Sequence, residues 1–252
     1  TEPAYTAWWQ MDSKLSAPKN SNLKTVMDFS FFDKINTAKN EQTETWFKGL
    51  DRIYNNFVYD FLYPNPASVL AFIENHDTDR FLGEGNNLPM LKQASTLLLT
   101  TRRIPQLYYG TEVMMNGVKS KSDGYVRKDF PGGWTGDATN ALTPAGRTKI
   151  QNECYDFYKT ILNWRKGNDV IAKGSMVQFM VQNGVYAYAR QYEGKTIFVM
   201  LNGTDAETTV PLKFYKEILK NSKQGKDILS GKAITFGEEL KMGPRESLVI
   251  EL

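Results

Sequence analysis

The arrangement of apolar and polar positions divides the chain into two unlike parts. The first part holds three short apolar runs of strand length, at residues 23–29, 69–73 and 105–109. Each run is followed by a segment in which apolar residues recur every third or fourth position, as in amphipathic helices, at residues 46–62, 88–101 and 143–167. This alternation predicts three parallel βα units in succession.

Local signals mark where these helices begin and end. Asn87 is a predicted N-cap of the second helix, and Thr143 with Pro144 has the residue types of a third helix start. The sequence YPNP at 63–66 ends the first helix, because proline lacks the backbone N–H that a helix interior requires. Capping residues thus support the boundaries that the apolar pattern indicates.

From residue 169 the pattern becomes that of short strands separated by turns. Five such segments are predicted: residues 175–182, 185–192, 195–201, 207–212 and 246–252. Glu193 and Gly194 have the composition of a two-residue hairpin turn. Closely spaced strands with turn signals predict a small antiparallel β-sandwich. We therefore expect two domains, residues 1–168 and residues 169–252.

Composition limits the classes of partner. The 252 residues are 41% hydrophobic and 23% charged, as in ordinary globular proteins. A net charge of +3 without a concentrated Lys/Arg run gives no indication of nucleic-acid binding. No apolar stretch approaches the roughly 18 residues that a membrane span requires. The one cysteine, Cys154, has no partner for an internal disulfide.

The stretch AFIENHDTDRF, residues 71–81, places the only histidine of the chain directly after a predicted strand. In parallel βα architectures, residues just past the carboxyl end of a strand face the site. Asn75, His76 and Asp77 occupy that position, where they can transfer protons, bind a metal or hold sugar hydroxyls. Metal binding is the weaker of these interpretations, because the chain has one histidine and no cysteine pair at ligand spacing. In the alternative interpretation, Asp77 caps the next turn and His76 is merely a surface imidazole.

Four motifs, taken together, resemble the α-amylase family of glycoside hydrolases. FIENHDTDRF at 72–81 resembles that family's seventh-strand motif, and IPQLYYGTE at 104–112 its eighth-strand signature. NSNLKTVMDF at 20–29 is similar to the sixth-strand region of the neopullulanase and cyclomaltodextrinase branch, where RKDFPGGW at 127–134 also recurs. The resemblance implies an α/β plus all-β fold, namely the C-terminal part of a (β/α)8 TIM barrel (strands six to eight) followed by a small antiparallel β-sandwich.

The resemblance also implies catalytic roles. Asp77 corresponds to the family's third carboxylate, which binds sugar hydroxyls and helps distort the ring toward the transition state. His76 would hydrogen-bond to the same sugar, where charge develops. Asn75 belongs to the same motif and is expected to bind substrate.

Further substrate-binding residues are expected on the loops nearby. Asp123 and Arg127 resemble the pair that grips the next sugar toward the non-reducing end, and an ordinary loop salt bridge is the alternative. Tyr109 is expected to bind substrate. Four more aromatic residues could stack on sugars: Trp8, Trp9, Tyr108 and Trp134. Core packing is the expected role for most of these rings. No metal ligand and no cofactor is predicted in this chain, and calcium is left open for a longer form of the protein.

The family's other two catalytic carboxylates are not recognised in this sequence. They follow strands four and five of the barrel, whereas the first recognisable motif corresponds to strand six, and Glu2 is not taken as the acid. We therefore expect a C-terminal fragment of an enzyme that cleaves α-glucosidic bonds, of the α-1,4 type, in starch-like glucans or maltooligosaccharides with retention. The fragment alone would be inactive. The alternative is a non-catalytic, amylase-like subunit that binds glucan or another protein.

The unpaired edges of three βα units also imply a partner. We expect either an N-terminal half-barrel fragment or self-association through the cut edge. Localisation is open, with the periplasm or the cell exterior favoured because polymer-degrading enzymes often work there. The chain has Arg103 where relatives usually have a glycine that eases the turn into strand eight.

Overall fold

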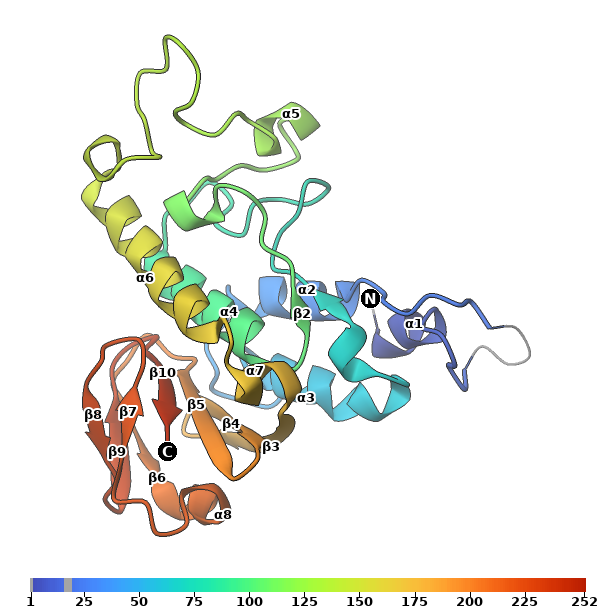
Figure 1. Cartoon of the computed structure of the whole chain (residues 1–252), viewed down its shortest axis with the longest axis vertical. Helices are drawn as coiled ribbons and strands as arrows, with labels where there is room; N and C mark the ends of the chain where they lie inside the picture. Colours follow the sequence, from blue (N-terminus) through green and yellow to red (C-terminus); the bar gives the residue numbers. More distant parts are fainter. Residues whose placement is uncertain (1, 16–19) are drawn as a thin grey trace.

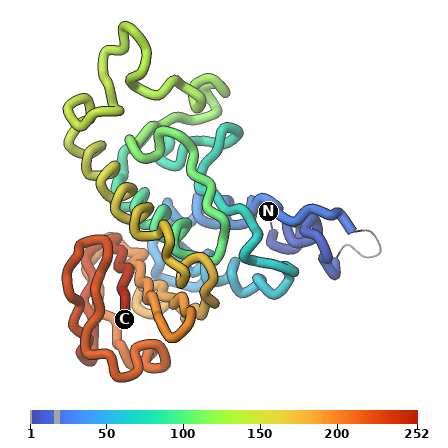
Figure 2. The backbone as a smooth tube through the Cα atoms, in the orientation of Figure 1, coloured from blue at the N-terminus to red at the C-terminus, as the bar shows by residue number. Residues whose placement is uncertain are grey.

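The computed structural model describes residues 2–15 and 20–252. A helical part lies above an all-β part, and the long helix α6 (Lys149–Arg165) runs down toward the junction between them (Figure 1). Helix α1 (Pro3–Trp8) projects sideways from the helical part, whereas the C-terminus lies within the all-β part (Figure 2). Among the described residues, no helix combines the length and the apolar character needed to cross a membrane.

The remaining elements are short. The other α-helices are α2 (Phe29–Ala38), α3 (Asp51–Val58), α4 (Leu88–Thr100), α5 (Asp123–Val126), α7 (Asp169–Lys173) and α8 (Lys216–Leu219). The 3-10 helices are η1 (Tyr59–Leu62), η2 (Pro66–Ser68), η3 (Thr111–Val113), η4 (Pro144–Gly146) and η5 (Leu212–Tyr215). The strands are β1 (Leu70–Ala71), β2 (Ile104–Pro105), β3 (Ser175–Gln182), β4 (Val185–Tyr192), β5 (Lys195–Asn202), β6 (Thr208–Pro211), β7 (Gln224–Asp227), β8 (Ala233–Thr235), β9 (Glu239–Met242) and β10 (Ser247–Glu251).

The three strand segments predicted in the first part lie side by side and parallel. Leu70 of β1 pairs with Ile104 of β2 on one edge and forms a parallel bridge with Met27 on the other. Two backbone hydrogen bonds form this bridge, since the Leu70 N–H donates to the Val26 carbonyl at 2.9 Å and the Asp28 N–H donates to the Leu70 carbonyl at 2.7 Å. The paired lengths are shorter than the predicted runs, since β1 and β2 have two residues each. Closure of these segments into a barrel stays a prediction.

Helix α3 begins at Asp51 and not at Trp46 as predicted. Phe47 and Gly49 have positive φ values of 61° and 54°, which a right-handed helix excludes. The Asp51 carboxylate accepts the Phe47 N–H at 2.6 Å and closes this turn. The apolar spacing of residues 46–50 predicted the wrong conformation because it carries no information on backbone handedness.

Capping decides where α4 and α6 begin. Asn87 caps α4 as predicted, its side-chain oxygen accepting an N–H of the first turn at 3.1 Å. The predicted start of α6 was wrong, because Thr143 makes no side-chain cap and precedes only the short η4. Thr148 and Gln151 instead form a capping box at the true start. Two reciprocal hydrogen bonds there satisfy the backbone N–H groups of Thr148 and Gln151.

The C-terminal part consists mostly of antiparallel β-sheet, as predicted. One sheet has six strands in the order β3-β4-β5-β10-β7-β8, and a second sheet pairs β6 with β9. The hairpin turn is confirmed, since Glu193 and Gly194 have φ values of 47° and 78°, as a type I′ turn requires. Strands β7, β8 and β9 were not predicted, because they are only three or four residues long and carry few apolar side chains.

One hydrophobic cluster crosses the predicted domain boundary. Tyr186 and Tyr188 of the six-stranded sheet lie in the same buried cluster as Leu97 of α4. The hydroxyl groups of Tyr188 and Thr100 lie 2.5 Å apart. The other face of the sheet packs against the β6–β9 pair in a second cluster. The two parts therefore share one core, and their division at residue 169 stays a prediction.

Arg190 on β4 connects the six-stranded sheet to helices α4 and α7 by hydrogen bonds. Its guanidinium is buried and donates to the carbonyls of Thr100, Ile171 and Gly174 at 2.8–3.0 Å. These carbonyls lie at the C-terminal ends of α4 and α7, where aligned peptide dipoles favour a cation. Burial lowers the pKa of the Arg190 guanidinium to about 10. The sheet is thus held to the helical part by polar contacts as well as by the shared core.

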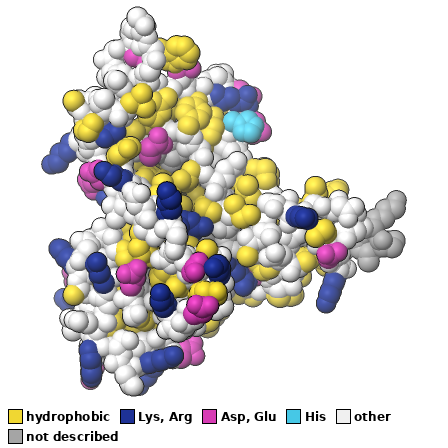
Figure 3. Space-filling view, viewed as in Figure 1, with side chains coloured by type: hydrophobic (Ala, Val, Ile, Leu, Met, Phe, Trp, Pro, Cys, Tyr) yellow, Lys and Arg dark blue, Asp and Glu magenta, His cyan; other side chains and the backbone are white. Residues whose placement is uncertain are grey.

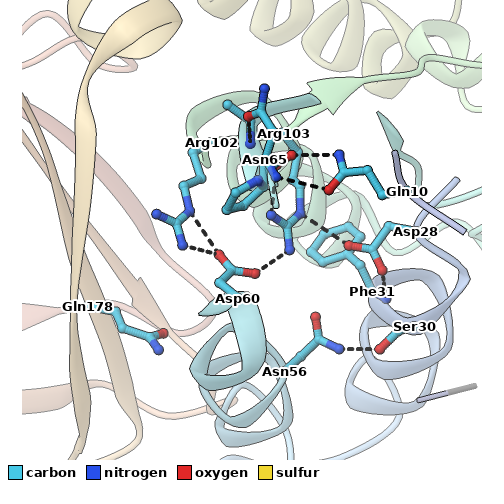
Figure 4. A network of polar contacts seen from close by, with 12 residues as sticks. Gln10, Asp28, Ser30, Phe31, Asn56, Asp60, Asn65, Arg102, Arg103 and Gln178 are labelled. Atoms are coloured by element: carbon cyan, nitrogen blue, oxygen red, sulfur yellow. Dashed lines mark hydrogen bonds and ion pairs between the residues drawn. The ribbon is translucent and has the colours of Figure 1, made fainter. Parts of the chain in front are cut away.

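Arg103, the departure noted before strand eight, lies at the centre of a buried polar network (Figure 4). Its Nε donates to Asp28 at 3.1 Å, its Nη1 to the Pro66 carbonyl at 2.9 Å, and its Nη2 to Asp60. The guanidinium also lies 5.1 Å from the ring centre of Tyr63. Burial raises the pKa of Asp28, and the Arg103 cation acts in the opposite direction. Side-chain contacts of Arg103 therefore hold the turn before β2 in place.

We expect Arg103→Met to lower the free energy of unfolding by about 3–5 kcal/mol. The change leaves Asp28 without its cation and leaves Asp60 with Arg102 alone. Urea denaturation followed by circular dichroism measures the effect. Lys241→Met is the control, because Lys241 is 74% exposed in its ion pair with Glu207 and such pairs contribute little. Equal losses in the two variants would contradict the role of the network.

Candidate active site

The predicted site residues gather beyond the carboxyl ends of the parallel strands. Three segments meet there: residues 74–81 after β1, residues 106–113 after β2, and residues 117–128 around α5. The Arg80 N–H donates to the Gly117 carbonyl at 3.0 Å, which joins the first segment to the third. The histidine (cyan) lies at the surface beside basic and acidic side chains (Figure 3).

Asn75 shapes the turn that carries His76 and Asp77. Asn75 is only 4% exposed, and its Oδ1 accepts the Asp77 N–H at 2.8 Å, which forms an Asx turn. Its own N–H donates to the Thr78 hydroxyl at 3.0 Å. The side chains of His76 and Asp77 remain 61% and 58% exposed. The structure thus places Asn75 inside the turn and presents its two neighbours to solvent.

Arg127 joins this turn to α5. Its Nη2 lies 2.9 Å from Asp77 Oδ1 and 3.1 Å from Asp123 Oδ2, and its Nε donates to the His76 carbonyl at 2.8 Å. His76 Nε2 lies 3.1 Å from Asp77 Oδ2. The Arg127 guanidinium therefore fixes the positions of the Asp77 and Asp123 carboxylates relative to each other. The Asp123–Arg127 salt bridge considered from the sequence is present, and it includes Asp77 as well.

Lys119 is a member of this cluster that the sequence analysis missed. Its Nζ lies 3.3 Å from Asp123 Oδ1 and donates to the Asp77 carbonyl at 3.1 Å. Its backbone N–H donates to Asp79 Oδ1 at 2.6 Å. The spacing of four residues between Lys119 and Asp123 was the available signal. The cluster therefore contains two cations, and both contact Asp123.

A buried ion pair lies beneath the exposed cluster. The side chains of Glu74 and Arg80 are 2% and 0% exposed, and Glu74 Oε1 lies 3.3 Å from Arg80 Nη1. Glu74 also accepts the Phe81 N–H at 2.5 Å and the Thr111 hydroxyl. Burial raises the pKa of the Glu74 carboxyl, and these donors act in the opposite direction. The ionisable residues after β1 therefore form two pairs. Glu74 and Arg80 are buried and close the loop, whereas His76 and Asp77 are exposed at the site.

Tyr109 lies beside this cluster with its ring half-exposed. The residue is 40% exposed, and its hydroxyl donates to the Lys128 carbonyl at 2.6 Å. Its ring packs edge-on against that of Tyr108, with centroids 4.7 Å apart. Both ends of the Tyr109 side chain are therefore fixed while part of the ring stays accessible.

Core packing was the wrong expectation for the tryptophans. Trp8, Trp9 and Trp134 are 49%, 60% and 69% exposed. Trp8 and Trp9 stack on each other, with ring centroids 6.3 Å apart, on the projecting helix α1 and its C-cap. Trp134 lies on the long loop before α6, where its backbone N–H donates to the Asp137 carboxylate at 3.1 Å. All three rings are therefore largely accessible to solvent.

Within residues 2–15 and 20–252, no group of three or more His, Cys, Asp or Glu side chains is placed to hold a metal ion. The carboxylates at the site instead contact a guanidinium and an ammonium group. Such an arrangement of exposed donors and acceptors beside an aromatic ring suits the binding of polyhydroxylated molecules.

Comparison with known proteins finds one matching family and several similar sequences. Residues 176–251 match the family described as the cyclo-malto-dextrinase C-terminal domain. Over 226 residues, the sequence is 29% identical to an α-amylase of Niallia circulans, a match that covers 86% of this chain and 38% of the relative. Over 233 residues, it is 30% identical to a cyclomaltodextrin glucanotransferase of Thermoanaerobacterium thermosulfurigenes, covering 89% of this chain and 29% of the relative.

Solved structures share the fold. An Anoxybacillus α-amylase superposes with a TM-score of 0.75 at 20% identity, covering 99% of this chain and 49% of that one. The α-amylase of Geobacillus thermoleovorans, complexed with acarbose, superposes with a TM-score of 0.72 at 21% identity, covering 92% of this chain and 48% of that one.

The chain is thus related to the α-amylase family of glycoside hydrolases, and the resemblance that its motifs indicated is confirmed. More particularly, its all-β part matches the C-terminal domain of cyclomaltodextrinases. The chain spans less than half the length of these relatives.

We expect Asn75→Ala to raise the hydrogen-exchange rate of the Asp77 amide about tenfold, the loss of roughly one hydrogen bond. The amide loses its acceptor, Asn75 Oδ1. Amide exchange followed by NMR measures the rate. Asn75→Asp is the matched control, because a carboxylate oxygen can accept the same bond, and its rate should stay near that of the unchanged chain. Unchanged exchange in the alanine variant would contradict the Asx turn.

Proposed function

We propose that this chain is the C-terminal portion of an α-amylase-family glycoside hydrolase. The enzyme would cleave α-1,4-glucosidic bonds in starch-like glucans or maltooligosaccharides with retention of configuration. In this proposal the segment at Met27, β1 and β2 are strands six, seven and eight of a (β/α)8 barrel. Residues 1–168 form that part of the barrel, and residues 169–252 form a separate C-terminal domain.

The meeting of Asp77, Arg127 and Asp123 beyond the carboxyl ends of parallel strands carries the proposal. Active sites of (β/α)8 barrels lie at that end, because the loops there are free to vary while the barrel stays rigid. The relatives that match most of the chain are named as an α-amylase and as glucanotransferases. One of the structures that share the fold was solved with acarbose.

Each residue receives a role that its position allows. Asp77 and His76 contact the sugar at the bond to be cleaved, where hydrogen bonds that strengthen in the transition state lower the barrier. Arg127 and Asp123 hold the next sugar, and Tyr109 presents its ring to an apolar sugar face. Asn75 acts on the substrate through the turn that it forms, in addition to any direct contact.

The nucleophile and the acid/base residue are assigned to a segment of the enzyme outside these 252 residues. Retaining hydrolysis needs two carboxyl groups about 5–5.5 Å apart on either side of the bond. The two site carboxylates in this chain, Asp77 and Asp123, both contact Arg127, so both are assigned to binding. The chain alone therefore lacks covalent catalysis.

We expect no release of reducing sugar from maltoheptaose by the purified chain. Joining it to an upstream segment that carries barrel strands one to five should produce hydrolysis. Product analysis by chromatography measures both. Turnover by the chain alone would contradict the placement of the two carboxyl groups upstream. Binding of glucan without turnover by the joined form would favour a non-catalytic subunit.

In the joined form, Asp77→Asn should lower kcat/KM about 10²–10³-fold, the cost of removing one transition-state contact. Asp169→Asn is the matched control, because Asp169 is 57% exposed and pairs with Lys173 of its own helix. Steady-state kinetics on maltooligosaccharides compares the two variants. A loss of similar size in both would show that the effect does not come from the site.

The proposal also accounts for apolar surface on the N-terminal side of the helical part. Leu23, Met27 and Trp9 are 49%, 39% and 60% exposed. They line a hollow of about 480 Å³ together with Tyr5, Thr6, Thr25, Val26 and Phe29. The segment at Met27 also has no strand partner on its outer edge among the described residues. We assign this surface to contact with an N-terminal half-barrel, or with a second copy in its absence.

We expect the isolated chain to self-associate at micromolar concentration, and Trp9→Gln to weaken the association. Leu142→Gln is the control, since Leu142 is 61% exposed but lies on the loop before α6. Sedimentation velocity over a concentration series measures the stoichiometry. A monodisperse monomer, unchanged by either substitution, would contradict the assignment of this surface.

A further inference from the structure

Arg80 is completely buried, although it follows directly on the exposed residues of the site. Its side chain is 0% exposed, whereas those of His76 and Asp77 are 61% and 58% exposed. It pairs with Glu74 across the base of the loop. Burying a guanidinium is costly, so its contacts indicate what the fold gains from it. Its Nε and Nη1 atoms have hydrogen-bond partners, whereas Nη2 has none among the described residues.

These contacts reach all three segments of the site. Nη1 lies 3.3 Å from Glu74 Oε1 in the first segment and donates to the Tyr109 carbonyl in the second at 2.6 Å. Nε donates to the Val126 carbonyl in the third at 3.0 Å. Val126 directly precedes Arg127, the residue that binds both site carboxylates. One planar group therefore spans the loops that carry every residue assigned to the site.

The same guanidinium supports the aromatic part of the site. It lies 4.0 Å from the ring centre of Tyr108 and 4.8 Å from that of Tyr109. Cation–π contact of this kind fixes the two rings from the buried side. The exposed part of the Tyr109 ring is therefore held in a fixed position relative to its own segment, residues 106–113.

We infer that Arg80 is a positioning residue that sets the distances among Asp77, Tyr109 and the Asp123–Arg127 pair. It acts through the backbone at Tyr109 and Val126 and does not itself reach the substrate. Its importance for sugar binding rests on the proposed function, whereas its effect on the geometry of the cluster does not.

Arg103 provides a matched comparison within the same chain. Its side chain is 1% exposed, pairs with two carboxylates and lies over aromatic rings. Arg103 is therefore a buried arginine whose contacts are of the same kinds as those of Arg80. It lies directly before β2, whereas Arg80 lies beyond the end of β1. Loss of either residue should destabilise the fold, but only loss of Arg80 should alter the site.

The test uses the single histidine as a reporter. Selective ¹³C labelling of histidine gives one imidazole signal, from His76, which contacts Asp77 and Arg127. The signal is recorded for the unchanged chain, Arg80→Met, Arg80→Lys and Arg103→Met. We expect it to move in both Arg80 variants and to stay in place in Arg103→Met. Lysine is expected to fail as a substitute because one ammonium group cannot reach carbonyls on two loops and the Glu74 carboxylate together.

Addition of maltoheptaose to the same samples separates the two proposals. The His76 signal of the unchanged chain should move on titration, and the Kd should rise about tenfold in Arg80→Lys, as for one lost charge-assisted hydrogen bond. No movement with sugar in the unchanged chain would count against the proposed function, while the sugar-free comparison would still decide the role of Arg80.

A wild-type His76 signal in folded Arg80→Met or Arg80→Lys would overturn the inference. So would an equal displacement in Arg103→Met, which would indicate a general loosening of the fold. If Arg80→Met does not fold, the lysine variant decides alone, because it keeps the charge that Glu74 requires.

Discussion

Buried arginines tie together the parts of this chain that its short strands pair only weakly. Between the parallel segments, Leu70 pairs with Ile104 and bridges Met27, which leaves few ladder hydrogen bonds to fix their relation. Arg103 lies before β2 and Arg80 beyond β1, so the segments are held at both ends by side chains. Arg190 performs the same task between β4 and the helices. The rest of the fold, including the site, depends on these three contacts.

The three buried guanidinium groups differ in the partners that they contact. Arg103 contacts Asp28 and Asp60, so attraction between opposite charges offsets the loss of water. Arg190 contacts backbone carbonyls at helix ends, and burial accordingly lowers the pKa of its guanidinium to about 10. Arg80 combines one carboxylate, two carbonyls and two rings. Rigid, forked donors suit this purpose because one arginine can bond to several segments at once.

This arrangement explains why ionisable residues crowd the stretch after β1. Glu74 and Arg80 are internal and close the loop, whereas His76 and Asp77 face solvent on the turn that Asn75 forms. The backbone between the two pairs is itself bonded to the third segment, because the carbonyls of His76 and Asp77 accept from Arg127 Nε and Lys119 Nζ. Sequence alone located the stretch and its outward-facing residues. It did not assign Arg80, since burial of a charged residue cannot be inferred from local pattern.

The sequence by itself determined the three parallel strand segments, the antiparallel character of the last third, the hairpin at Glu193 and Gly194, and the location of the ionisable stretch after β1. These follow from local periodicity, turn chemistry and short motifs. The tertiary structure alone decided the true starts of α3 and α6, the strands β7 to β9, the shared core across residue 169, and the roles of Arg80, Arg103 and Lys119. Each of those depends on contacts between residues far apart in the chain or on backbone handedness, and neither is encoded in the spacing of apolar positions.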